Sequence, residues 1–485
     1  MFSLAHFRTR MLLFLSHLML SACSSETQPD KTTQSTTANK AEDIPKGHLQ
    51  LIPKPKDAIS DTDIELVLFV VVDTLRADIL SSYGAEKTTA GFDALSNLGV
   101  VFENAYSPAS WTRSSMASLF TGLYPTQLSM HEKAWSEEKL KSKPHWRDKR
   151  EQTPIKLPTE LKTIPISFKE LGFSTACFVN QPALHSSLFK KGFDHSVIPS
   201  PESGKVLIGR QHKQKWASLS ESYEQDQLLY QEMISWIEKT EGKKFAWLHM
   251  LTPHKPYDPM ESLAPKEVPK GIKGQALQYA AEVQEMDIVI GKLVAYLKEN
   301  KLLGKTAIVL TSDHGEGFGE HKMREHGHTL MSEVTHVPLI VVAPQIKPGK
   351  EPRTVSTLDS WPTLLDIVGG DLSDKISGRS LFDTESRPIF SEAMLYGSTE
   401  RMLIDGDFKF IEDLQLDEPL LFNLKEDPKE LNNLASSNPD KREELNKKLR
   451  ALHDSLLVDQ KGILSGDLIE ESTDMEALKE LGYIE

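Results

Sequence analysis

After Glu65 the chain reads Leu66-Val67-Leu68-Phe69-Val70-Val71-Val72, and Asp73 follows directly. The run is apolar at every position and does not alternate with polar residues, which indicates a strand covered on both faces. Such strands belong to parallel sheets, and ligands bind beyond their carboxyl ends. Asp73 therefore lies where chemistry would take place, although taken alone an aspartate in a turn or a helix cap is the alternative.

Further apolar runs alternate with helical segments along the chain. We predict strands at residues 174–179, 245–250, 307–310 and 337–343. We predict helices at residues 92–98, 164–171, 225–239 and 277–297. This alternation indicates an α/β fold with a mostly parallel central sheet and helices on both faces.

From about Arg387 the pattern changes to short apolar runs split by turns such as Asp405-Gly406-Asp407. These runs are residues 402–404, 408–411 and 420–424, and an amphipathic pattern follows at residues 443–457. They predict an antiparallel meander and a helix. We therefore expect a main domain over residues 62–386 and a C-terminal antiparallel-sheet and helix subdomain over residues 387–485.

Composition limits the possible partners. The chain has 485 residues and a formal net charge of −14, which argues against a general nucleic-acid binder, so we expect no nucleic-acid partner. A local basic pocket for an anionic substrate remains compatible with this charge. Residues 133–156 form a basic, loop-like insertion, which we interpret as a solvated loop or, alternatively, as a lid that attracts an anionic substrate.

The N-terminus resembles a bacterial lipoprotein signal. Arg8 and Arg10 precede an apolar run too short to span a bilayer, and the run ends in Leu20-Ser21-Ala22-Cys23. We predict a signal peptide over residues 1–22, lipidation of Cys23 and a flexible tether over residues 23–61. The expected location is the bacterial cell envelope, on the periplasmic side of the outer membrane. An ordinary secretory signal with an incidental cysteine is the alternative.

Residues 110–122 read Ser110-Trp111-Thr112-Arg113-Ser114-Ser115-Met116-Ala117-Ser118-Leu119-Phe120-Thr121-Gly122. They indicate a short helix that ends at Gly122 and has Thr112 at its N-terminus. Because the free N–H groups of a helix N-terminus suit an anion, a hydroxyl held there could attack a bound phosphate or sulfate ester. The alternative is that Thr112 only caps the helix.

Two further segments follow strands and carry candidate ligands. Asp313 and His314 stand side by side in a turn after residues 307–310, a plausible metal site next to Asp73. His254 lies in a proline-bracketed turn after residues 245–250, either as a turn histidine or as a contact to an anion or leaving group. His321, His326 and His328 come next in the chain, and surface positions are the alternative for several of them.

Taken together, these segments resemble the sulfatase family of the alkaline phosphatase superfamily, over nearly the whole chain from Glu65 to Tyr483. The matching motifs are Val71–Asp78, Thr112–Gly122, His254–Tyr257, Ser312–Glu316, His326–Thr329, Val337–Ile340, and Leu421–Leu424 with Asp427-Pro428. Several motifs in the right order are far more specific than any one alone.

The resemblance implies one divalent metal, calcium, manganese or zinc, bound by Asp73, Asp313 and His314. Thr112 would be the nucleophile and would also touch the metal. His326 or His328 would steady the anion or protonate the leaving group, and His254 would line the same pocket. We also expect Ser114 and Ser115, through N–H groups at the helix N-terminus, and Lys255 to contact the substrate.

The sequence departs from the family at the nucleophile. Sulfatases modify a Cys or Ser to formylglycine within a Cys-x-Pro-x-Arg frame, but this frame reads Thr112-Arg113-Ser114-Ser115-Met116 here. Threonine cannot give that aldehyde, and the Thr form instead resembles the superfamily's phosphodiesterases and its phosphoethanolamine or glycerol-phosphate transferases. The family's paired acids after the first strand are reduced to Asp73-Thr74.

Three functions are compatible with these residues. The first is a metal-dependent hydrolase of sulfate or phosphate esters that forms a covalent intermediate on Thr112. The second is a transferase that moves a phospho-substituent onto a cell-envelope glycan or lipid; such transferases usually carry several membrane spans. The third is an inactive binding protein on the same fold, against which the presence of Asp73, Thr112, Asp313 and His314 argues.

Overall fold

The computed structural model describes residues 64–130, 155–200, 205–206, 222–371, 376–392, 395–396, 399–414, 419–465 and 467–471. The predicted signal peptide, Cys23, the tether and most of the 133–156 insertion lie outside these residues. Within the described ranges, none of the helices combines the length and the apolar character that crossing a membrane requires.

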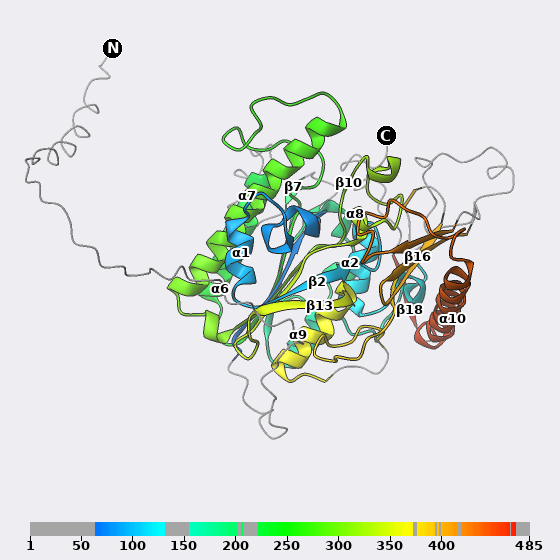
Figure 1. Ribbon diagram of the computed structural model, residues 1–485. Helices are drawn as coiled ribbons and strands as arrows, with labels where there is room; N and C mark the ends of the chain where they lie inside the picture. The colour runs from blue at the N-terminus through cyan, green and yellow to red at the C-terminus, as the bar shows by residue number, and fades with distance from the viewer. Residues whose placement is uncertain are drawn as a thin grey trace, which may run out of the picture. The chain divides into compact units, whose positions relative to one another are not determined.

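An eight-stranded sheet forms the centre of the described chain (Figure 1), in the order β13-β2-β12-β9-β1-β8-β4-β5. The strands are β13 (Gly349–Ser356), β2 (Val100–Tyr106), β12 (Leu339–Val342), β9 (Thr306–Thr311), β1 (Leu66–Val72), β8 (Lys244–Met250), β4 (Ser174–Val179) and β5 (His195–Val197). All run in one direction except β12, which is antiparallel to both neighbours. The chain leaves β9 and enters β12 at the same edge of the sheet, so β12 has to run back. The predicted mostly parallel sheet is confirmed.

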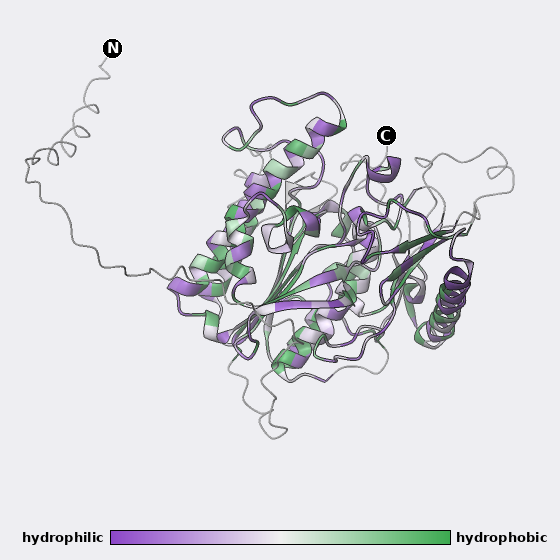
Figure 2. Ribbon diagram, viewed as in Figure 1, coloured by the Kyte–Doolittle hydropathy of each residue, from purple (hydrophilic) through white to green (hydrophobic). Residues whose placement is uncertain are grey.

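Strand β1 shows why its sequence is apolar throughout. Val67, Phe69 and Val71 pack into the core on one face, under α2 (Thr112–Thr121), α4 (Ile164–Glu170) and α9 (Ser360–Val368). Leu66, Leu68, Val70 and Val72 pack into the core on the other face, under α1 (Ala90–Ser96), α6 (Ser222–Lys239) and α7 (Ile272–Glu299). Figure 2 shows apolar colour along the central strands and mixed colour on the outer helices.

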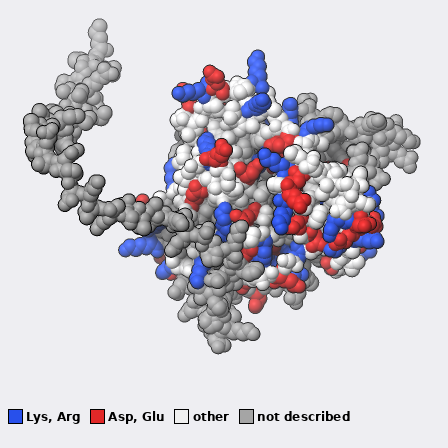
Figure 3. Space-filling view, in the orientation of Figure 1, with Lys and Arg blue, Asp and Glu red and all other residues white. Residues whose placement is uncertain are grey.

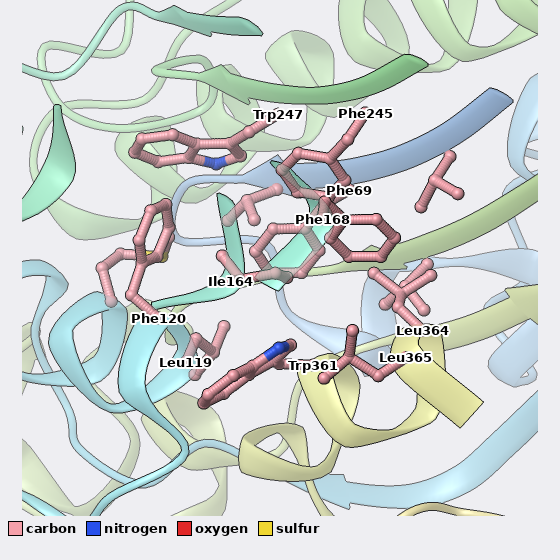
Figure 4. Packing of buried hydrophobic residues seen from close by; sticks show 14 of the residues in the cluster. Phe69, Leu119, Phe120, Ile164, Phe168, Phe245, Trp247, Trp361, Leu364 and Leu365 are labelled. Atoms are coloured by element: carbon pink, nitrogen blue, oxygen red, sulfur yellow. The ribbon is translucent and has the colours of Figure 1, made fainter. Parts of the chain in front are cut away.

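Aromatic rings fill the core beneath α2 (Figure 4). The rings of Phe168 and Phe245 stack at 4.4 Å, and Phe120 meets Trp247 edge-on at 4.5 Å. Gly122 ends α2 in the left-handed region at φ 67°, and a β-carbon there would lie 3.1 Å from the ring of Trp361. Only glycine suits both the backbone angle and this contact, so the predicted helix end is confirmed.

A second sheet, antiparallel, follows the main one in the chain. It contains β14 (Ile389–Ser391), β15 (Glu400–Asp405), β16 (Phe408–Asp413) and β17 (Leu420–Asn423). Helix α10 (Pro439–Ile463) covers one face, and the other face packs on Tyr106, Leu330 and Met331. The outer surface of α10 carries interspersed acidic and basic side chains (Figure 3). The predicted meander and C-terminal helix are confirmed.

Smaller elements complete the described part. They are the strand pairs β3 (Ile155–Pro158) with β18 (Leu468–Glu471), β6 (Pro199–Ser200) with β7 (Lys205–Val206), and β10 (Gly317–Phe318) with β11 (Arg324–Glu325), and helix α8 (Ser332–Thr335). The last pair and α8 lie in the long connection from β9 to β12, which carries His321, His326 and His328.

Candidate active site

The carboxyl ends of parallel strands bring the candidate residues to one edge of the central sheet. Asp73 follows β1, Asp313 and His314 follow β9, and His254 follows β8. Thr112, the first residue of α2, arrives after β2. Asp73, Asp313 and His314 are inaccessible to solvent. Segments distant in the chain thus form one buried constellation, as expected for the ligand edge of an open α/β sheet.

One atom from each of three side chains converges on a common point. Asp73, Asp313 and His314 each offer a ligand atom within 4.8 Å of the others, and no other such group occurs among the described residues. His314 Nε2 lies 3.4 Å from Asp313 Oδ2 and 3.8 Å from Asp73 Oδ1. We refer to these three residues as the acid–histidine cluster.

The remaining polar atoms of the cluster are held by the protein. Asp313 Oδ1 accepts hydrogen bonds from the backbone N–H groups of Thr74 at 3.3 Å and His314 at 3.0 Å. The amide of Gln181 donates to Asp73 Oδ2 at 2.5 Å, and His249 Nε2 lies 3.5 Å from the same oxygen.

His314 Nδ1 lies 2.9 Å from the carbonyl of Gly315, which only accepts, so Nδ1 donates to it and Nε2 is the ring nitrogen that a metal would use. Asp73 Oδ1 and Asp313 Oδ2 are buried without a hydrogen-bond partner in the described structure. Two carboxylate oxygens and one imidazole nitrogen therefore lie close together, and this set of donors fits a divalent metal ion.

Without a cation, the negative charges of the two carboxyl groups in the cluster are not fully compensated. Burial and the charge of Asp73 raise the pKa of Asp313 above its ordinary value. Burial also disfavours the charged form of Asp73, but the hydrogen bond from His249 and the nearby His254 and His314 keep its pKa below the ordinary value. Two carboxyl groups this close repel each other when both are ionised, and a bound cation would relieve that repulsion.

Thr112 is the first helical residue of α2 and not its cap. Trp111 occupies the N-cap position, and no side-chain capping bond is present there. The Thr112 hydroxyl instead lies 3.1 Å from His314 Nε2, at the point where the cluster converges. The interpretation of Thr112 as only a cap is therefore wrong.

The two serines predicted at the substrate differ in position. The N–H of Ser115 donates to Trp111 at 3.1 Å as the first intrahelical bond, and its hydroxyl donates to the carbonyl of Asp313 at 2.6 Å. Ser115 thus steadies Asp313, and its donors do not face an incoming anion, contrary to our expectation. Ser114 is buried in the first turn of α2, where N–H groups lack intrahelical partners.

The histidines of the β9–β12 connection are not surface residues as a group. His326 and His328 are buried, and His321 is partly buried. The His326 ring lies 4.3 Å from the His314 ring and 5.2 Å from the His254 ring, so these three form one group. His328 stacks on Tyr396 at 4.6 Å. The surface alternative is thus wrong for His326 and His328.

Lys255 was predicted at the substrate next to His254. Its ammonium lies 2.6 Å from Glu325 in a partly exposed ion pair. The lysine charge is thus already compensated within the protein, and a direct substrate contact by Lys255 stays a prediction.

Four residues that the sequence analysis did not single out support the site. Gln181 and His249 hold Asp73, as described above. Glu316 Oε2 accepts a hydrogen bond from the hydroxyl of Tyr257 at 2.9 Å, and Glu316 Oε1 lies 3.0 Å from His326 Nδ1. Gln181 follows a parallel strand just as Asp73 does, so the strand-end rule could have identified it; His249 lies inside β8 and carries no such pattern.

A family model and several curated proteins match this chain. The family model described as "Sulfatase" matches residues 65–370. Arylsulfatase K of Xenopus laevis is 34% identical over 196 residues, which are 36% of this chain and 36% of that protein. Arylsulfatase K of Homo sapiens is 31% identical over 202 residues, 38% of each chain. The alignments thus span well under half of these relatives.

Solved structures share the fold. The phosphonate monoester hydrolase of Agrobacterium radiobacter superimposes with a TM-score of 0.62 and 19% identity, over 80% of this chain and 96% of that one. A 2-O GAG sulfatase superimposes with a TM-score of 0.64 and 19% identity, over 85% of this chain and 96% of that one. At this identity the likeness supports the α/β architecture.

Proposed function

This chain belongs to the sulfatase family, and we propose from this that it is a metal-dependent hydrolase of sulfate or phosphate esters with the unmodified Thr112 hydroxyl as nucleophile. The observation that carries the proposal is the position of Thr112 Oγ1, 3.1 Å from His314 Nε2, beside the two unbonded carboxylate oxygens of Asp73 and Asp313.

Asp73, Asp313 and His314 would hold the metal. A divalent cation bound there lowers the pKa of a neighbouring hydroxyl and offsets negative charge on the ester oxygens. The N–H groups in the first turn of α2 add partial positive charge on the same side. Each of these features favours an anionic ester whose central atom lies against Thr112.

The protein's own groups complete a balanced reaction. Thr112 Oγ1, its proton already lost to water, attacks phosphorus or sulfur, and the bond from that atom to the leaving oxygen breaks. The leaving oxygen takes a proton from a histidine of the β9–β12 connection, His326 or His328. Water then attacks the ester on Thr112 and returns one proton to the same histidine, which releases the inorganic ion and restores the threonine oxygen.

The sequence and the relatives support a proposal for the substrate and its location. Among the similar proteins are an arylsulfatase K, a 2-O GAG sulfatase and a phosphonate monoester hydrolase. We propose an anionic ester on a glycan or lipid of the bacterial cell envelope, with the enzyme tethered by lipid on Cys23 at the periplasmic side of the outer membrane.

The test uses nitrophenyl esters of phosphate and of sulfate, with and without a chelator. We expect chelation to stop turnover and Thr112→Ala to lower it by at least about 10⁴-fold, as expected for a lost nucleophile. Thr121→Ala is the matched control: Thr121 lies at the far end of α2, where its hydroxyl donates to the carbonyl of Ala117 at 2.7 Å and accepts from the N–H of Leu123 at 3.3 Å. Intact mass after rapid quenching should show the phosphoryl or sulfuryl group on wild type and not on Thr112→Ala.

Full activity of Thr112→Ala with unchanged metal content would overturn the assignment of the nucleophile. Turnover that persists without any divalent metal would overturn the metal dependence. The class of ester that wild type cleaves decides between sulfate and phosphate.

A further inference from the structure

Asp226 lies on α6, inaccessible to solvent, and its carboxylate ties together the ends of two strands at the edge of the sheet that carries the candidate site. We propose that Asp226 is a positioning residue for the metal site. By joining the ends of β4 and β8, it keeps Gln181 and His249 in place on Asp73. This inference rests on the proposed function, because it concerns the metal that the proposed reaction requires.

The carboxylate lies where the hydrogen-bond ladder between β4 and β8 ends. The parallel pairing of the two strands stops with the N–H of Asn180, which donates to the carbonyl of His249 at 2.9 Å. Asp226 Oδ1 accepts from the side-chain amide of Asn180 at 2.9 Å and from the N–H of Leu251 at 3.0 Å. Asp226 Oδ2 accepts from the N–H of Thr252 at 2.9 Å. One carboxylate thus holds three donors that follow two neighbouring strands.

The same two strand ends carry the groups that hold Asp73. Gln181 follows Asn180 directly, and its amide donates to Asp73 Oδ2. His249 is the last but one residue of β8, and its Nε2 lies 3.5 Å from the same oxygen. A shift of either strand end therefore moves a partner of Asp73. A carboxylate that loses a partner can rotate and turn its open oxygen, Oδ1, out of the acid–histidine cluster.

A role in stability alone explains Asp226 less well. Helix α6 has apolar contacts of its own in the core, through Leu229, Met233 and Ile237. Burial raises the pKa of Asp226 to about 6, although the neighbouring N–H groups lower it. The folded state therefore disfavours the charged carboxylate, so this group lowers the free energy of unfolding above pH 6 relative to a pH below its ordinary pKa. A charge kept at this cost is expected where it serves a neighbouring site.

The experiment measures the Mn²⁺ affinity of the metal-free protein by competition with a chelating dye. In Asp226→Asn an NH₂ group replaces one acceptor oxygen, so at least one of the three hydrogen bonds is lost. We expect the affinity to fall about 10-fold, as for the loss of an outer partner of a metal ligand. The melting temperature of the metal-free variant should stay close to that of metal-free wild type, because a buried charge is removed.

Glu392→Gln is the matched control. Glu392 is also a buried acid that holds a backbone segment, since it accepts from the N–H of Thr126 at 2.7 Å and from the Thr126 hydroxyl at 2.6 Å. We expect the Mn²⁺ affinity of this variant to equal that of wild type. Asn180→Ala removes the β4 half of the bridge and should show the Asp226→Asn pattern with a smaller amplitude, which keeps the test valid if Asp226→Asn folds poorly.

Two further readouts separate positioning from a general loosening of the fold. In Gln181→Ala one partner of Asp73 is already missing, so Asp226→Asn should lower the Mn²⁺ affinity by clearly less than it does in wild type. The visible spectrum of bound Co²⁺ depends on the geometry of its ligands. It should change in Asp226→Asn and stay the same in Glu392→Gln.

An unchanged Mn²⁺ affinity in Asp226→Asn, or additive losses in the Gln181→Ala background, would overturn the positioning role. The proposed function would stand in that case, provided that wild type binds Mn²⁺ and its turnover depends on Thr112. A wild type that binds no divalent ion, or whose turnover does not need Thr112, would instead overturn the proposed function.

Discussion

Two buried charged groups in this molecule use the same kinds of side chain in opposite ways. At the contact between the two sheets, Lys409 Nζ lies 2.7 Å from Glu430 Oε1, and both side chains are inaccessible. The N–H and hydroxyl of Ser332 donate to Glu430 at 2.8 and 2.7 Å. We call Ser332, Lys409 and Glu430 the junction network.

In the junction network one positive and one negative charge meet, and each carboxylate oxygen has a partner. In the acid–histidine cluster two carboxyl groups share one histidine, and one oxygen of each has no partner in the described structure. Buried polar groups in native proteins are nearly always satisfied, so the exceptions point to a missing ligand. The junction network thus joins parts of the fold, whereas the acid–histidine cluster has the open oxygens of a cation-binding site.

Within this comparison, the largest expected effect is the loss of metal affinity in Asp313→Asn. We expect affinity to fall by about 10³-fold or more, since loss of even an outer-shell partner costs about 10–100-fold. The metal-free variant should be at least as stable as metal-free wild type, because a repulsion with Asp73 is removed. Elemental analysis and metal-free melting curves measure both, and unchanged stoichiometry would remove Asp313 from the ligand set.

Breaking the junction network should act on stability alone. Lys409→Met leaves the Glu430 carboxylate buried without its cation, which we expect to cost about 3–5 kcal/mol of unfolding free energy. Lys425→Met is the control, since its pair with Asp407 is exposed at 4.0 Å and worth about 0–1 kcal/mol. Metal affinity should not change in either variant. A metal defect in Lys409→Met would show that the two groups are coupled.

The smallest expected effect is on the free energy of unfolding and comes from His321, which lies next to the junction network. Its Nδ1 lies 3.0 Å from Glu333 and its Nε2 3.0 Å from the carbonyl of Glu430, so both nitrogens face acceptors and the ring is charged. The hydrogen bond to Glu333 raises the pKa of His321 from 6.5 to about 9, although burial opposes it. The raised value means that the stabilisation is complete below pH 6.5 and is lost as the pH rises through about 9.

The measurement compares wild type with His321→Gln by denaturant unfolding across this pH range. Because the ring is partly exposed, we expect a difference of about 1–2 kcal/mol at low pH that shrinks as the pH rises through the raised pKa. A difference that does not depend on pH would show that the histidine acts through packing.

Prediction from the sequence succeeded where the structure depends on a short local pattern of residue types. Strand β1 is apolar on both faces because both faces are covered, and Gly122 ends α2 because only glycine suits its backbone and its contact with Trp361. Strand β13 escaped prediction, since Gly349-Lys350-Glu351-Pro352-Arg353 carries few apolar residues. It lies at the edge of the sheet, where one side needs no pairing partner.

The sequence by itself determined strands β1, β4, β8, β9 and β12 of the central sheet, that the chain carries Asp73, Asp313 and His314 beyond the carboxyl ends of β1 and β9, and that a threonine opens α2. These features depend on residue type and short spacing. Only the tertiary structure decided which oxygen of Asp73 stays open, because Gln181, 108 positions away, occupies the other. The same is true of Glu316, whose two carboxylate oxygens contact His326 and Tyr257. Such choices depend on atoms that meet only when several strands lie side by side, and no local pattern records them.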